Sequence, residues 1–178
     1  MHLAVALALT LVLGACAPAP EPDPVRVLFV DPIGPSPKPS IFPASCAGTL
    51  EYPDPICTPG AVVSVTKDQI CSRPAVHDSR PPVSWTTPVK ARLVRIYGAV
   101  AGTDLGGYEL DHLVPLELGG AGWDVRNLWP EPVPTPNPKD RVENAAKIAV
   151  CAGKLPLDQA QREIARDWKA LGRSLGVA

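Results

Sequence analysis

Two helices are predicted in the C-terminal part of the chain. The first should begin at Asn137-Pro138 and end at Gly153, because proline is tolerated at the first helical position and glycine terminates helices. Its apolar side comprises Val142, Ala145, Ala146, Ala149 and Val150. In the second, apolar residues recur every three or four positions with charges between them, which is typical of an amphipathic helix. These residues are Leu157, Ala160, Ile164, Trp168 and Leu171.

Two shorter helices are predicted farther toward the N-terminus. Thr66–Gln69 has the Thr-x-x-Gln form of a capping box and should start a short helix that carries Cys71. Thr87-Pro88 marks a second start, since proline loses no needed hydrogen bond at the first helical position. Apolar residues with helical spacing follow, and Gly98 is the expected stop. They are Val89, Leu93, Val94, Ile96 and Tyr97.

Alternating apolar and polar residues predict a strand over Tyr108 to Leu116. A glycine-rich loop follows, and Val125–Trp129 is predicted to be a second short strand. Prolines 130, 132, 134, 136 and 138 are expected to prevent regular pairing after it. Strand, loop, strand and helix thus form one unit from Tyr108 to Ala152. The predicted fold class is α+β.

Residues 1–15 are typical of a signal peptide. Leu3–Leu13 is almost entirely apolar, but it is too short to cross a bilayer, which takes about 20 residues. Small residues follow, as they do before a cleavage site, although no Lys or Arg precedes the apolar run. Leu13–Cys16 resembles a bacterial lipoprotein box, in which Cys16 becomes the lipidated N-terminus. The alternative is a buried or anchoring N-terminal helix.

Residues 16–45 are rich in proline. The chain of 178 residues contains 23 prolines, and they are unevenly distributed along it. Repeated proline favours extended, solvated conformations, so we expect a semi-rigid tether. A proline-rich ligand for a partner is the alternative, and Val25–Val30 could pair as an edge strand. The globular domain is predicted to span residues 46–178.

Four cysteines remain once Cys16 is set aside from the total of five, an even number that suits disulfides in an oxidising compartment. No CxxC or CxxH spacing supports a zinc site. Four cysteines can pair in three ways, and we expect the one with the disulfides Cys46–Cys57 and Cys71–Cys151. The first would close a short loop, and the second would join the early helix to the helix of the hairpin unit. The protein is therefore expected outside the cytoplasm, as a lipoprotein on the outer face of a membrane or in the periplasm, or secreted.

His112 is the centre of the predicted site. It lies beside Asp111 in an otherwise apolar strand, where a charge is costly unless it is paired or useful. By itself, an Asp-His pair favours a structural hydrogen bond over catalysis. The formal net charge of −1 excludes a strong global field for nucleic acid, although a local basic patch remains compatible with it.

The sequence around His112 resembles a known superfamily. The run E-L-D-H-L-V-P-L-E-L-G-G, followed by W-D-V-R-N-L-W-P and a helix, resembles the HNH or ββα-metal (His-Me finger) nucleases. It is more closely similar to small bacterial HNH-like proteins with the pattern DHLIPLELGG, NLWP and KDxxE. The resemblance covers roughly Val89 to Trp168. It implies a ββα-metal hairpin-plus-helix unit with flanking helices, stabilised here by disulfides.

The resemblance also assigns roles within the hairpin. His112 matches the histidine that deprotonates the attacking water, a task that suits an imidazole because its pKa of about 6.5 lies near working pH. Asn127 matches the residue whose side-chain carbonyl orients that histidine. Asp111 matches the hairpin metal ligand. Carboxylate oxygen favours Mg²⁺ or Mn²⁺, which would stabilise charge on the scissile phosphate.

The helix departs from the family pattern, because many HNH proteins place a histidine there and this helix has none. Asp140 and Glu143 are the candidate metal ligands instead, and Asn144 shares a helix face with Asp140. An ordinary solvated first turn is the alternative for Glu143 and Asn144. Lys139 and Arg126 are candidate contacts for a substrate phosphate, the alternative for Arg126 being the outer face of its strand.

Taken together, these features predict metal-dependent phosphodiester hydrolysis of DNA or RNA by an exported, monomeric protein that touches a membrane only through a lipid anchor. Two alternatives stay open. One is a non-catalytic, envelope-associated binding module that keeps the HNH-like fold, which the altered helix and near-neutral charge favour. The other is a disulfide-stabilised structural lipoprotein without a ligand.

Trp129 and Trp168 are predicted to pack in the core.

Overall fold

The computed structural model describes residues 29–30, 42–49, 51–72, 80–98, 105–132 and 137–177. The predicted signal peptide, Cys16 and most of the predicted tether lie outside these residues. Within the described part of the chain, no helix is both long and apolar enough to span a membrane.

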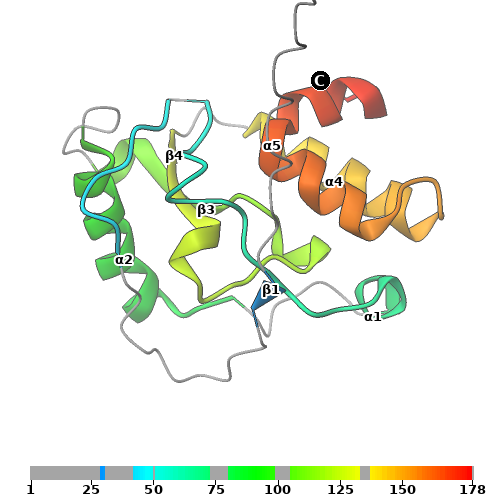
Figure 1. Ribbon diagram of the computed structural model, residues 1–178, viewed down its shortest axis with the longest axis horizontal. Helices are drawn as coiled ribbons and strands as arrows, with labels where there is room; N and C mark the ends of the chain where they lie inside the picture. Colours follow the sequence, from blue (N-terminus) through cyan, green and yellow to red (C-terminus); the bar gives the residue numbers. More distant parts are fainter. Residues whose placement is uncertain are drawn as a thin grey trace, which may run out of the picture.

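Four helices and two small sheets make up the described part of the fold, which confirms the α+β class. The helices are α1 (Lys67–Ser72), α2 (Val83–Ile96), α4 (Pro138–Cys151) and α5 (Leu157–Leu175). The strands are β1 (Phe29–Val30), β2 (Val62–Val63), β3 (Tyr108–His112) and β4 (Leu128–Pro132). β1 pairs with β2 in parallel, as the edge-strand alternative allowed, and β3 pairs with β4 antiparallel. Figure 1 shows the β3–β4 hairpin between α2 and the α4–α5 pair.

The β3–β4 register explains how a proline-rich segment forms a strand. The prediction that Pro130 and Pro132 would prevent pairing was wrong, since they lie opposite Leu110 and Tyr108. The N–H of Leu113 donates to the carbonyl of Asn127, and hydrogen-bonded pairs alternate from that point along an antiparallel hairpin. Both prolines therefore fall at the intervening positions, where the partner strand requires no N–H.

Both strands are displaced from their predicted limits. β3 ends at His112 rather than Leu116, and β4 begins at Leu128 rather than Val125. A bend at Leu113 and Val114 follows β3 and leads to a 3₁₀ turn at Leu116–Leu118, and a second 3₁₀ turn at Val125–Asn127 precedes β4. The cause is the side chain of Asn127, whose amide takes the backbone groups of Val114 that a longer strand would use.

The predicted start of α2 was also wrong, because the helix begins at Val83 and contains Pro88. The residue before the helix is Pro82, which is extended and follows Pro81. Two consecutive prolines therefore restrict the backbone before the first turn. Burial of Val89, Leu93 and Val94 along one face outweighs the single backbone hydrogen bond that Pro88 cannot make. The helix ends at Ile96, just before Gly98.

Features determined by local chemistry agree with the predictions. Thr66 and Gln69 form the reciprocal capping box, with the Thr66 N–H donating to Gln69 Oε1 at 2.8 Å and the Gln69 N–H to Thr66 Oγ1 at 3.2 Å. The Asn137 side chain caps α4 by accepting from the Lys139 N–H.

The disulfides Cys46–Cys57 and Cys71–Cys151 are both present, and the second joins α1 to the end of α4. Two disulfides are consistent with an exported protein.

Two apolar clusters support the hairpin from opposite sides. One lies between α2 and the hairpin and includes Leu93, Tyr97 and Trp129. The other lies between α4 and α5 and includes Ile164 and Trp168. Both tryptophans are buried, as predicted. The hairpin is thus held between two packed layers, which fixes the backbone at His112.

Candidate functional site

His112 ends β3 with its ring held by one backbone group. Its Nε2 lies 3.1 Å from the carbonyl oxygen of Gly122. A carbonyl only accepts, so Nε2 carries the hydrogen and Nδ1 keeps its lone pair. No described residue bonds Nδ1, and no buried side-chain nitrogen or oxygen in the described part of the chain lacks a partner. The residue as a whole is buried, with 7% of its surface exposed.

The charge state of His112 follows from its surroundings. Burial lowers the pKa of His112 to about 4, and the positive charges of Arg80 and Lys139 act in the same direction. The Gly122 hydrogen bond and the charge of Asp111 oppose this shift. The imidazole is therefore neutral at pH 7, with an unprotonated Nδ1 that can accept a proton.

Asn127 does not contact His112, contrary to expectation. Its Oδ1 accepts from the Val114 N–H at 2.9 Å, and its Nδ2 donates to the carbonyls of Val114 and Ala121. Ala121 precedes Gly122, so Asn127 fixes the loop whose backbone holds the histidine. A Cβ at Gly120 would lie 1.8 Å from the Val114 carbonyl oxygen and 2.7 Å from Asn127 Nδ2, so this packing requires glycine there.

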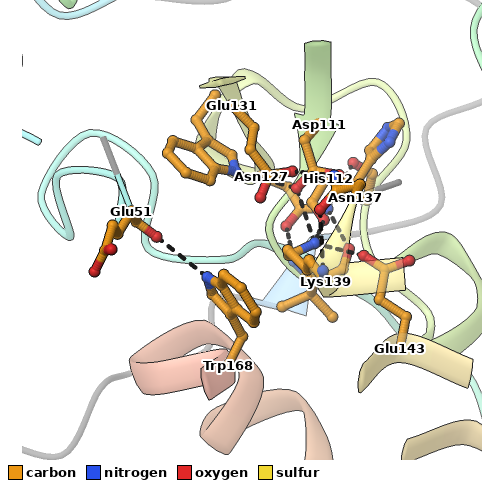
Figure 2. A network of polar contacts seen from close by, with 12 residues as sticks. Glu51, Asp111, His112, Asn127, Glu131, Asn137, Lys139, Glu143 and Trp168 are labelled. Atoms are coloured by element: carbon orange, nitrogen blue, oxygen red, sulfur yellow. Dashed lines mark hydrogen bonds and ion pairs between the residues drawn. The ribbon is translucent and has the colours of Figure 1, made fainter. Parts of the chain in front are cut away.

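Lys139 is the most buried charged group of the site, with a side-chain exposure of 0%. Its Nζ lies 2.8 Å from Asp111 Oδ2 and 2.9 Å from the His112 carbonyl oxygen, and it also contacts Glu143 Oε1 (Figure 2). Each of the three ammonium hydrogens thus has an acceptor. Burial alone would lower the pKa of Lys139, but the surrounding carboxylates raise it above its usual range. The expected surface contact with a phosphate is not possible for an ammonium buried in this way.

Carboxylates surround this ammonium. Asp111 Oδ2 also accepts from Trp129 Nε1 at 3.1 Å. Burial raises the pKa of Glu143 to about 7, although Lys139 opposes the shift. Burial also raises the pKa of Glu131 to about 8, and the charge of Asp111 adds to that effect. Sequence reasoning missed Glu131 because its proline-rich segment was expected to form no strand.

The remaining candidates lie away from this cluster or already have partners. Asp140 is exposed, and the side chain of Asn144 donates to its backbone carbonyl. Arg126 forms a two-pronged ion pair with Asp124. The structure therefore brings the side chains of Asp111, Lys139 and Glu143 together, with His112 joined to them through its backbone carbonyl, and leaves Asp140 and Arg126 outside the group.

Asp111 and Glu143 supply carboxylate oxygens, and the Lys139 ammonium pairs with one oxygen of each. Their side chains are 13% and 18% exposed, and oxygen ligands suit Mg²⁺ or Mn²⁺. No described residue forms a hydrogen bond or ion pair with the second carboxylate oxygen of either. A cation bound there would lie next to the Lys139 ammonium and would share both carboxylates with it.

The group of three possible ligand atoms that the described residues bring close together lies elsewhere. Those of Cys46, Asp54 and Cys57 are all within 4.8 Å of one another. Both sulfurs belong to one disulfide, so they are not thiolates while that bond is intact. Asp54 accepts from the N–H groups of Ala47 and Ile56. This group is therefore no counterpart of the carboxylate site.

Glu131 should make stability fall as the pH rises. Its pKa is raised from 4.5 to about 8 in the folded protein, so between these values the folded state holds a proton that the unfolded state has lost. Its stabilising contribution is complete below pH 4.5 and is lost as the pH rises through about 8. Glu131→Gln keeps an acceptor for Asn137 but removes the charge. Denaturant unfolding at several pH values should show a flatter profile for the variant; identical slopes would contradict the assignment.

Comparison with known proteins adds no relative. No family model, curated protein or solved structure matches the chain. The chemistry of the site is therefore argued from its own geometry.

Proposed function

We propose that the protein hydrolyses phosphodiester bonds in nucleic acid, with His112 as the general base that deprotonates the attacking water. The observation that carries the proposal is the neutral ring held through Nε2 by the Gly122 carbonyl, an arrangement that leaves the lone pair on Nδ1. General-base catalysis needs this combination of fixed orientation and a free lone pair. The resemblance of the surrounding sequence to HNH nucleases supports the same role.

A divalent cation, Mg²⁺ or Mn²⁺, would be held by Asp111 and Glu143, and when bound it would stabilise negative charge on the scissile phosphate. Lys139 holds the two carboxylates and the His112 carbonyl in one cluster. Asn127 acts as a positioning residue, because it fixes the loop that carries Gly122. The proposed hydrolysis thus combines a general base on β3 with carboxylate metal ligands on β3 and α4.

Metal dependence tests which helix residue is the ligand. Glu143→Gln should raise the Mn²⁺ concentration for half-maximal cleavage by about tenfold or more, because it removes an anionic ligand. Asp140→Asn, the matched change on the exposed side of α4, should leave that concentration nearly unchanged. A large shift for Asp140→Asn alone would move the ligand to Asp140.

The buried Lys139 favours a second candidate function, a non-catalytic binding module with the HNH-like architecture. In that case the ammonium replaces the metal as the cation among the carboxylates. The wild-type protein would then cleave nothing with any divalent metal, and His112→Ala would mainly reduce stability or the affinity for a partner.

We also propose that residues 1–15 direct export, which the two disulfides support, and that Cys16 is lipidated. Cys16→Ser should release the protein from the membrane fraction. Unchanged fractionation would contradict the lipid anchor.

A further inference from the structure

Trp85 and Trp123 form an aromatic pair next to the His112 loop. Their ring centroids are 5.2 Å apart, with the ring planes tilted by 56°. Trp85 packs against the core on one side, and both side chains remain partly exposed. Trp123 directly follows Gly122, whose carbonyl holds the His112 ring. A partly exposed aromatic pair therefore lies one residue away from the group that positions the proposed base.

Arg80 brings positive charge to the same region. It is exposed and lies just before α2, the helix that carries Trp85. None of the residues that the structure describes forms a hydrogen bond or ion pair with it, whereas Arg126 is paired with Asp124 and Lys139 is buried.

The three residues suit an unpaired strand of nucleic acid. In a duplex the base faces are covered by stacking, whereas a single strand can lay a base on an aromatic side chain while its backbone follows a cation. The chain's net charge of −1 provides little attraction for a whole duplex. We propose that Arg80, Trp85 and Trp123 bind a single-stranded segment beside His112, with a phosphate on Arg80 and a base on the tryptophan pair. This inference rests on the proposed function and adds its substrate class.

Binding without cleavage tests this surface. The full chain would be titrated in EDTA against labelled oligothymidylate of about ten nucleotides and against an abasic oligomer of equal length. Trp85→Ala should weaken binding of oligothymidylate by about tenfold or more and leave the abasic oligomer unaffected, because only the base stacks. Trp85→Phe keeps a ring and should restore most of the affinity.

Arg80→Ala should weaken both oligomers equally and reduce the salt slope of binding by about 0.7, the value for one phosphate contact on a single strand. Arg166→Ala removes an exposed arginine on α5 and is the matched control, for which we expect no change. An effect of Arg166→Ala equal to that of Arg80→Ala would overturn the assignment of Arg80.

Other outcomes separate this inference from the proposed hydrolysis. The surface is refuted if Trp85→Ala weakens both oligomers equally, if the wild type binds the abasic oligomer as tightly as oligothymidylate, or if a duplex binds more tightly than either. Base-dependent binding without cleavage in Mn²⁺ would sink the hydrolysis and leave the surface. Equal cleavage of duplex and single strand would refute the single-strand surface and leave the proposed hydrolysis standing.

Discussion

Replacing Lys139 with methionine should lower the free energy of unfolding by about 3–5 kcal/mol, the usual cost of leaving a buried ion pair without one partner. The Lys139 ammonium is fully buried and contacts three acceptors. Methionine keeps the apolar stem but leaves the carboxylates of Asp111 and Glu143 close together without a cation. Denaturant unfolding of the disulfide-intact protein measures the loss.

The matched control is Lys147→Met on the same helix. Lys147 pairs with Glu117 at 3.5 Å, and both side chains are partly exposed, so the expected loss is at most about 1 kcal/mol. The cost of Lys139→Met should also shrink in acid, where protonation neutralises the orphaned carboxylates. Equal losses for the two variants would show that Lys139 does not neutralise the acid cluster.

Replacing His112 should reduce the rate of phosphodiester cleavage by about a hundredfold or more, the usual scale for removal of a general base. His112→Ala also deletes a largely buried ring and leaves the Gly122 carbonyl without its donor, so it should lose stability as well.

His112→Gln separates the two effects. Its side-chain amide can donate to the Gly122 carbonyl as Nε2 does, but it has no basic nitrogen. We expect near wild-type stability and the same loss of cleavage. Because the pKa of His112 is about 4, its base form should persist well below the pH at which an ordinary histidine becomes protonated. Wild-type rates in the Gln variant would exclude His112 as the base.

The sequence predicted best those features that depend on near neighbours. The capping box at Thr66–Gln69 and the Asn137-Pro138 start of α4 form because one side chain and one nearby N–H suffice. The start of α2 was misplaced because Pro88 lowers helix propensity locally, whereas burial of the apolar face of α2 is a tertiary effect. Pro130 and Pro132 were misjudged because they lie at positions of the hairpin where no N–H is required. Which positions those are depends on the strand register, which the local sequence does not reveal.

The structure brings some of the predicted site residues together but differs from the prediction in how they are arranged. Asp111 and His112 are adjacent in sequence, so their shared location needed no tertiary information. The role of Gly122 lies in its backbone carbonyl, which no side-chain pattern reveals. Lys139 was assigned to a phosphate because charge is visible in sequence, whereas the depth that directs it to carboxylates is not.

The most direct test of the central claim is cleavage of single-stranded and duplex substrates by the purified, disulfide-intact protein, with Mn²⁺ or Mg²⁺ and again with EDTA. His112→Gln should be assayed beside it. The account predicts cleavage by the wild type that EDTA abolishes and that falls by about a hundredfold or more in the variant. Substrates left uncut by the wild type across Mg²⁺, Mn²⁺, Ca²⁺ and Zn²⁺ would contradict it.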